Sequence, residues 1–252
     1  MGTVVFLLAA HLASGSLIIT ALLALRNRLP DSFLRFCLAA SALSAAVASI
    51  LSSGEVALAY GAVAAVAFLA YWRLRRSGRS PLLPVVGAAA AASIALALEC
   101  RGNESAGWLL CTAGSIGSAL LLGSVTVSMV LGHWYLVDTS LSIAPLKEGA
   151  LWLMGAVAVR WLNVVTVLAR EGWEVVRVTQ AADVFYSTLG LFFLFRAITG
   201  LIAPSLLAGP IWQTVRMRST QSATGLLYVA LVLVLFGELI AQFLTSATGF
   251  PL

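Results

Sequence analysis

Long apolar runs separated by short polar stretches make up almost the whole chain. Eight of these runs are close to or above the ~20 residues that a helix needs to cross a bilayer. They span residues 3–25, 33–52, 56–73, 81–98, 106–136, 149–169, 184–209 and 224–247. The short alternating segments of a transmembrane β-barrel do not occur in the sequence. The pattern predicts an all-α, polytopic integral membrane protein, a bundle of about eight transmembrane helices.

The composition agrees with this prediction and limits what the chain can do alone. Hydrophobic residues make up 61% of the 252 residues and charged residues only 10%, whereas about 25% of residues in a soluble domain are charged. No long polar segment interrupts the runs, so we expect a single membrane domain, residues 1–252. Similar small-residue patterns in the first and fifth runs suggest a four-plus-four repeat, 1–104 and 105–252. Any large catalytic domain would belong to another chain.

Basic residues are unevenly distributed between the loops, and this predicts the orientation. The loops after the first, third, fifth and seventh runs contain Arg26, Arg28, Arg35, Arg73, Arg75, Arg76, Arg79, Lys147, Arg216 and Arg218. The opposite loops contain only Arg101, Arg170 and Arg177, with several acidic residues that include Glu99. Cytoplasmic loops are enriched in Lys and Arg, so we expect both termini outside, in a bacterial-type plasma (inner) membrane. This topology accounts for the basic pI, and a nucleic-acid partner is not expected.

Three charged residues, Arg160, Arg196 and Glu238, fall inside the predicted spans. Each costs about 2.5–3.5 kcal/mol at a helix centre unless it is paired or hydrated. All three lie near the middle of consecutive spans, so we expect a Glu238–Arg196 pair with Arg160 and Asn163 nearby. Two arginines against one glutamate leave a positive charge that an anionic ligand or an acid of another subunit could balance. The cluster is therefore either a ligand site or a structural ion pair between helices.

The two histidines, His11 and His133, raise the question of a shared b-type haem. They are expected at different depths, roughly 15–20 Å apart along the membrane normal at the rise of an α-helix. One haem iron cannot reach both, because each bond is only ~2 Å long, so haem is not expected. His11 is either hydrogen-bonded to another helix or a donor to a quinone or proton relay. His133, beside Trp134 and Tyr135, is typical of an interfacial aromatic belt; a cytoplasmic-side quinone or proton site is the alternative.

The three cysteines, Cys37, Cys100 and Cys111, lack the spacing of a metal site, and no metal is expected. Cys37 falls within a predicted span. Cys100 and Cys111 are both expected near the outer face, but the start of a span separates them. We therefore do not expect a disulfide between them.

The seventh run contains Gly200, Pro204 and Pro210, a combination that predicts a kinked or broken helix. Broken helices in membranes are tolerated where they line a cavity or a protein contact. The polar stretch that follows contains Arg216 and Arg218. It is either a cytoplasmic contact surface for a partner or lipid headgroups, or an ordinary positively charged loop.

The chain ends with FGELIAQFLTSATGFPL, residues 236–252. With eight expected spans, both termini outside, little mass outside the membrane and an intramembrane Arg/Glu set, the chain resembles NrfD/DmsC-type quinone-interacting membrane anchor subunits. The resemblance covers the architecture of the whole chain and supplies no residue-by-residue ligand set. It implies a membrane subunit that passes electrons between quinol and an iron–sulfur partner, without a haem of its own.

Two functions follow from these features. The first is a non-catalytic membrane subunit of an electron-transfer complex, with a quinone or proton-relay site formed by His11, Arg160, Asn163, Arg196 and Glu238. Such a chain is at most one subunit of a membrane oxidoreductase, because motifs for self-contained catalysis such as HExxH and GxSxG do not occur in it. The second is a small-solute or ion transporter that uses a broken seventh span and the same charges. A purely structural assembly subunit is a third possibility.

Overall fold

The structure is a computed structural model that describes residues 2–27, 29–77, 82–101, 107–138, 141–179 and 188–251, with side chains except at 171 and 173–179. The helices are α1 (Gly2–Arg26), α2 (Asp31–Leu51), α3 (Gly54–Ser77), α4 (Leu82–Glu99), α5 (Gly107–Val137), α6 (Ala144–Thr179), α7 (Thr188–Ala197), the π-helical η2 (Ile198–Ile202), α8 (Ala203–Arg216) and α9 (Thr220–Thr248). No strand occurs in these ranges. The all-α prediction is confirmed.

Eight helical spans in the described chain are long and apolar enough to cross a membrane, as predicted. The first six and the last correspond to single helices, and the seventh combines α7, η2 and α8 over Thr188–Arg216. The largest difference from the predicted boundaries is in α6, which begins at Ala144 and continues to Thr179. The chain is therefore a polytopic helical membrane protein. The four-plus-four repeat stays a prediction.

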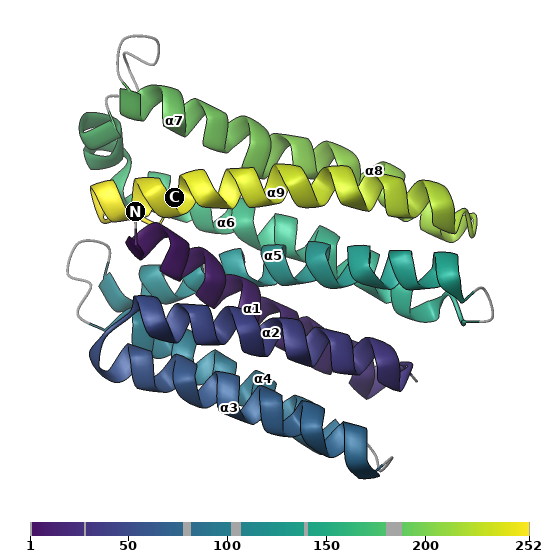
Figure 1. The fold of residues 1–252 in the computed structure, drawn as a ribbon. Coiled ribbons are helices and arrows are strands. Elements are labelled where there is room, and N and C mark those ends of the chain that lie inside the picture. Colours follow the sequence, from purple (N-terminus) through teal and green to yellow (C-terminus); the bar gives the residue numbers. More distant parts are fainter. Residues whose placement is uncertain are drawn as a thin grey trace.

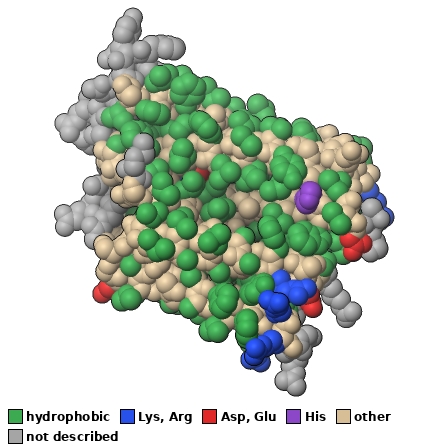
Figure 2. Space-filling model, viewed as in Figure 1, with side chains coloured by type: hydrophobic (Ala, Val, Ile, Leu, Met, Phe, Trp, Pro, Cys, Tyr) green, Lys and Arg blue, Asp and Glu red, His purple; other side chains and the backbone are tan. Residues whose placement is uncertain are grey.

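The helices form an elongated bundle in which α1 and α5 lie near the centre (Figure 1). α1 packs against α2, α4 and α5, while α5 also packs against α6 and α9. Both ends of the chain lie at the same end of the bundle (Figure 1), and we call this the terminal end. Figure 2 shows a surface covered largely by hydrophobic side chains, with the basic side chains of this face gathered away from the terminal end.

Glycines allow the two central helices to touch backbone to backbone. A Cβ atom at Gly15 of α1 would overlap the backbone carbonyl of Ala119 in α5, and one at Gly123 would overlap the backbone of Gly15. Close approach at small residues is a common way to join helices within a membrane. One turn closer to the terminal end, α1 and α5 contribute His11 and Ser115 to a polar cluster. The tight crossing therefore fixes the distance between the helices that carry this cluster.

The prediction for the seventh span was a kink or a break. The break does not occur, because the span is helical throughout, and the irregularity takes the form of the π-helical η2. α7 passes through η2 into α8, and Pro204 and Pro210 both lie within the helix (Figure 1). In a π-helical turn each N–H bonds five residues back, and such turns insert an extra residue into a helix. This turn ends at Ile202, two residues before Pro204, which has no N–H to donate. The wider turn accommodates the irregular hydrogen bonding near the proline without ending the helix.

Candidate functional site

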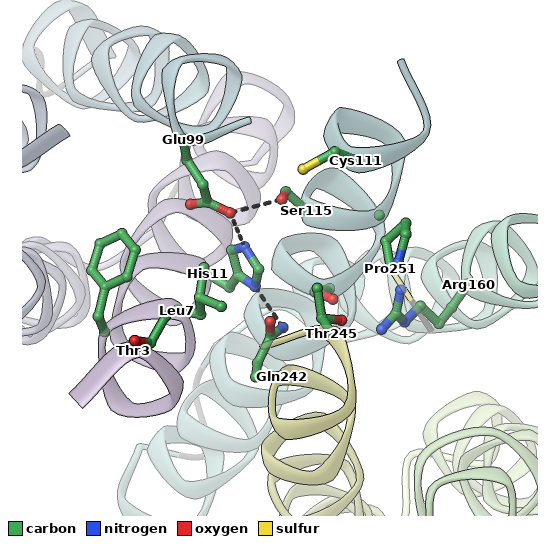
Figure 3. A pocket seen from close by; sticks show the side chains of 13 residues that line it. Thr3, Leu7, His11, Glu99, Cys111, Ser115, Arg160, Gln242, Thr245 and Pro251 are labelled. Carbon is green, nitrogen blue, oxygen red and sulfur yellow. Dashed lines mark hydrogen bonds and ion pairs between the residues drawn. The ribbon is translucent and has the colours of Figure 1, made fainter. Parts of the chain in front are cut away.

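A cavity of about 230 Å³ lies inside the terminal end of the bundle. Side chains from α1, α4, α5, α6 and α9 line it, and Pro251 contributes after the end of α9 (Figure 3). Its polar lining includes His11, Glu99, Ser115, Ser118, Arg160 and Gln242. Polar groups from five helices thus converge within a bundle whose outer surface is mainly apolar.

His11 occupies the middle of this polar lining, between Glu99 and Gln242 (Figure 3). Its Nε2 lies 2.7 Å from Oε1 of Glu99, and the Gln242 amide nitrogen lies 3.0 Å from its Nδ1. An amide nitrogen can only donate, so Nδ1 accepts and the proton of the neutral ring is on Nε2, where it is donated to Glu99. Both ring nitrogens are engaged, and the imidazole is 2% exposed. The ring is therefore held in one orientation and one tautomer.

Glu99 accepts hydrogen bonds from three different helices. His11 of α1 and the Ser115 hydroxyl of α5 each donate to Oε1 at 2.7 Å, and the Tyr60 hydroxyl of α3 donates to Oε2 at 3.0 Å. These donors compensate for removal of the carboxylate from water. The sequence analysis placed Glu99 in an outer loop, and this is wrong: it is the last residue of α4, with its side chain only 5% exposed. The packing of α4 against α1 turns it inward.

The second polar cluster contains Glu238 of α9 and two arginines. Arg160 donates from Nε to Oε1 at 3.2 Å and from Nη2 to Oε2 at 3.4 Å, and Arg196 donates from Nη2 to Oε1 at 3.2 Å. All three side chains are at most 2% exposed. The predicted Glu238–Arg196 pair with Arg160 nearby is therefore confirmed as a contact. Its use as a ligand site stays a prediction.

Two glycines allow the helices of this ion cluster to meet. A Cβ atom at Gly200 in η2 would overlap the Arg196 guanidinium, and one at Gly237 in α9 would overlap the backbone of Gly200. The absence of both side chains brings η2 against α9, so that Arg196 reaches Glu238. The π-helical turn begins two residues after Arg196, and single π-helical turns within helices are frequent at functional sites.

The two clusters meet at the wall of the cavity. Arg160 lines the cavity and binds Glu238, and Ser118 also lines the cavity while interacting with the Glu238 carboxylate. Both arginines contact Glu238, so the predicted ratio of two arginines to one glutamate is confirmed for the ion cluster. Glu99, which contacts His11, Ser115 and Tyr60, adds a second carboxylate to the wider site.

Asn163 lies one turn after Arg160 on α6 and outside the ion cluster. It is 6% exposed, and its amide nitrogen lies 3.5 Å from where a Cβ atom of Gly114 would stand and 3.6 Å from the same position at Gly117. Among the described residues its side-chain nitrogen and oxygen have no hydrogen-bond partner. Gly114 lines the cavity, so the amide lies beside the cavity wall. The expected proximity of Asn163 to Arg160 is confirmed, and its ligand-binding role stays a prediction.

His133 lies far from this site. It is exposed, and the Tyr228 hydroxyl is 3.4 Å from its Nδ1. Ser115, which shares Glu99 with His11, is 18 residues earlier on α5, a distance of about 27 Å along the helix. One haem iron cannot bind both histidines, as expected from their depths.

The other residues of the predicted interface lie at the same end of α5, at the end of α8 and in the turn before α9. Trp134 packs edge-to-face on Phe33 of α2, with ring centroids 5.9 Å apart. Tyr135 is 3% exposed and its hydroxyl donates to the Ser142 carbonyl, so it is part of the interior and not of an aromatic belt. Arg216 and Arg218 are exposed. An interface function for His133, Trp134, Tyr135, Arg216 and Arg218 stays a prediction.

Cys100 and Cys111 form a disulfide in the structure, with Cα atoms 5.7 Å apart, contrary to expectation. Cys100 directly follows α4 and Cys111 lies in the first turns of α5. The end of α4 and the start of α5 therefore lie side by side at the disulfide. The prediction assumed that the start of a span between the two cysteines would keep them apart. It did not consider that the end of α4 packs beside the start of α5.

Five residues of the site were not selected from the sequence: Tyr60, Glu99, Ser115, Ser118 and Gln242. The signal for Gln242 was present, because it lies four residues after Glu238 and therefore on the same face of α9. Glu99 and Tyr60 lie in or beside Ala-rich spans whose sequence does not indicate which face is buried. Only the packing of α3 and α4 brings them to His11.

The chain finds no match among protein-family models, curated proteins or solved structures.

Proposed function

We propose that this chain is a membrane subunit of an electron-transfer complex, and that its terminal-end cavity binds the head group of a quinone or quinol. The observation that carries the proposal is the hydrogen-bonded His11–Glu99 pair at the wall of a polar cavity. Small-molecule sites are typically concave, with a few converging polar groups that fix the orientation of the ligand. At about 230 Å³, this cavity suits a single ring, since it is smaller than the roughly 300–1,000 Å³ of drug-sized sites.

The charge balance favours a neutral ligand. Across the whole site, the two carboxylates Glu99 and Glu238 equal the two arginines in number when His11 is neutral, although both arginines contact Glu238. An anionic ligand would enter a site with no net positive charge, and desolvation of its own charge would be uncompensated. A quinone carbonyl needs only hydrogen-bond donors, and those of Gln242 and Arg160 line the cavity.

Oxidation of a quinol requires both an electron acceptor and a proton acceptor. Two O–H bonds break, two electrons leave for an iron–sulfur partner of the kind that the NrfD/DmsC resemblance implies, and two protons leave for water. Glu99 and His11 are 2.7 Å apart, a distance at which a carboxylate and an imidazole exchange protons readily. Their role is to take a proton from the ligand and pass it towards the terminal end of the bundle.

The orientation with both termini outside is part of the same proposal, in a bacterial-type plasma membrane. On the face drawn in Figure 2, the basic side chains gather at the end of the bundle opposite the termini, as expected if that end is cytoplasmic. The Cys100–Cys111 disulfide lies at the terminal end, and disulfides persist mainly in oxidising, extracytoplasmic compartments. A reporter fused after Arg76 should be cytoplasmic; a reporter found active only outside would reverse the orientation.

The transporter alternative required a broken seventh span, whereas this span is a continuous helix. The intramembrane charges on which it also depended are bonded to one another. Uptake of a solute by vesicles that contain only this chain would nevertheless favour it over the quinone proposal.

The proposal can be tested by photolabelling the purified chain with a photoreactive ubiquinone analogue, with decylubiquinone as competitor. We expect competed label on the α1, α5 and α9 peptides that line the cavity. His11→Gln should weaken competition about tenfold, or roughly 1.4 kcal/mol, because Glu99 and Gln242 lose the imidazole that orients them at the cavity. His133→Gln, at the opposite end of α5, is the matched control and should label like the unchanged chain.

A second variant separates ligand binding from folding. Leu7 lines the cavity, and Leu7→Trp should fill the space without removing a hydrogen-bonding group. We expect this variant to keep its thermal stability in detergent and to lose competed labelling. Label that decylubiquinone does not compete, or competed label confined to the His133 end, would refute the quinone site.

A further inference from the structure

The Cys100–Cys111 pair lies at the cavity and not merely near it. Cys111 lines the cavity wall, and Figure 3 shows its sulfur on the side that carries Ser115 and Glu99. Cys100 directly follows Glu99 in sequence and is fully buried. One sulfur of the pair therefore faces the proposed ligand, while the other is enclosed by protein.

A hydrogen-bonded path connects the same pair to the His11–Glu99 group. The Cys100 sulfur lies 3.6 Å from the Ser115 hydroxyl oxygen, and this hydroxyl donates to Glu99 Oε1 at 2.7 Å. Glu99 Oε1 in turn accepts from His11 at 2.7 Å. A proton released at the sulfur would reach a carboxylate and an imidazole through a single hydroxyl.

We propose that Cys100 and Cys111 are a redox-active pair, and that their dithiol form is oxidised by a quinone held in the cavity. The inference rests on the proposed function, because it assigns a second electron donor to the same quinone site. A quinone bound in the cavity would then accept electrons from the cysteine thiols, in addition to exchanging electrons with a partner subunit.

The reaction balances with the quinone as the oxidant. Two S–H bonds break and one S–S bond forms, so the pair loses two electrons and two protons. The quinone gains the same two electrons and two protons, and two O–H bonds form at its carbonyl oxygens. The reactive species is the thiolate, and the path through Ser115 to Glu99 supplies the base that removes the thiol proton. A protein dithiol outside this chain would be needed to reduce the disulfide again.

The third cysteine provides an internal control. Cys37 is buried in α2 and lines a separate crevice with Val127 and Val130 of α5. These residues are 16 and 19 positions along α5 from Cys111, or roughly 24–28 Å. Cys37 is therefore too far from the cavity to react with the same ligand.

The test is a single-turnover oxidation without oxygen. The Cys37→Ser chain, in lipid nanodiscs, is reduced, freed of reductant and mixed with duroquinone, whose fully substituted ring cannot add thiols. We expect one quinol formed and two thiols lost per chain, by ultraviolet absorbance and by maleimide labelling with mass spectrometry. Cys100→Ser and Cys111→Ser should form no quinol. His11→Gln should bind duroquinone more weakly and, at saturating duroquinone, oxidise the pair at least tenfold more slowly.

The outcomes separate this inference from the proposed function. If duroquinone displaces the photoreactive analogue but the reduced pair keeps both thiols, the pair is a structural clamp and the inference fails, while the quinone site stands. If duroquinone neither binds nor oxidises the pair, both proposals fail. If reduction alone unfolds the chain, as followed by circular dichroism, the pair is structural and the inference is again overturned.

Discussion

The two buried carboxylates of this protein are surrounded by different partners. Glu238 is bound by two guanidinium groups, which carry a permanent charge. Glu99 is bound by an imidazole and two hydroxyls, which are neutral donors or can change their protonation. The first environment fixes a carboxylate as an ion, and the second allows a proton to move. We infer that Glu238 mainly holds helices together, while Glu99 mainly serves the ligand.

The largest expected effect is on stability and follows from removing Glu238. Glu238→Ala would leave two buried arginines side by side without their carboxylate, and loss of one partner of a buried ion pair typically costs about 3–5 kcal/mol. Arg196→Ala should cost less, because the bidentate Arg160 contact remains. Thermal unfolding in detergent would measure both, and we expect the order Glu238→Ala, then Arg196→Ala.

A double variant makes this test sharper. Removing Glu238 and Arg196 together should recover part of the loss, since one uncompensated arginine is removed as well. Arg196→Lys should also be impaired, because an ammonium group does not reproduce a planar guanidinium. Equal stability of all these variants and the unchanged chain would contradict the structural role of Glu238.

The second prediction concerns Glu99, where we expect a small loss of stability and a large loss of function. Glu99→Gln keeps the shape and one acceptor oxygen, so we expect a loss of about 1–2 kcal/mol in stability. Because an amide cannot accept a proton as a carboxylate does, quinone-linked electron transfer should fall by about a hundredfold. Turnover with a reconstituted partner complex checks this, with Glu238→Gln as the comparison. A Glu99→Gln chain with normal turnover would remove the proton role from Glu99.

The third prediction concerns the contact that brings Arg196 to Glu238. Gly200→Ala would place a Cβ atom onto the Arg196 guanidinium and against Gly237, and overpacking of this kind costs about 1–3 kcal/mol. Gly155→Ala is the matched control, because a Cβ atom there meets nothing within 4 Å. It should be neutral or stabilising, since alanine favours helix more than glycine does. Equal unfolding temperatures for the two variants would argue against the close contact of η2 and α9.

The smallest effect is expected at the second histidine. His133 is exposed and its contact with Tyr228 is 3.4 Å long, so His133→Ala should change stability by no more than about 0.5 kcal/mol. The unchanged chain should show no bis-histidine b-type spectrum, because His11 and His133 are too far apart. A reduced-minus-oxidised Soret change that disappears in both His11→Ala and His133→Ala would overturn this.

The sequence predicted those parts of the structure that follow from one strong physical requirement. Apolar runs of sufficient length predicted the spans, and the cost of charge inside a membrane predicted that Glu238 would meet Arg196 and Arg160. Glu99 was missed because a charged residue at the end of an Ala-rich span reads as part of a loop. The π-helical turn after Arg196 was missed because proline and glycine indicate irregularity without specifying its form.

The disulfide and the His11 site were missed for a common reason. Both depend on which faces of helices meet, and Ala-rich helices such as α3 and α4 carry little periodic signal to indicate a buried face. Cys100 meets Cys111, and Glu99 meets His11, only after α4 has packed against α1 and the start of α5. Such contacts form only in the assembled bundle and cannot be predicted from the pattern of any single helix.

Both polar clusters depend on α9, which supplies Glu238 to the arginines and Gln242 to His11. During synthesis the helices emerge in chain order, so Arg160 and Arg196 enter the membrane before the carboxylate that neutralises them. Until α9 arrives, these arginines need water, lipid headgroups or an insertion factor as temporary partners. The final helix thus completes the neutralisation, and a chain that ended before it would keep two uncompensated arginines within the membrane.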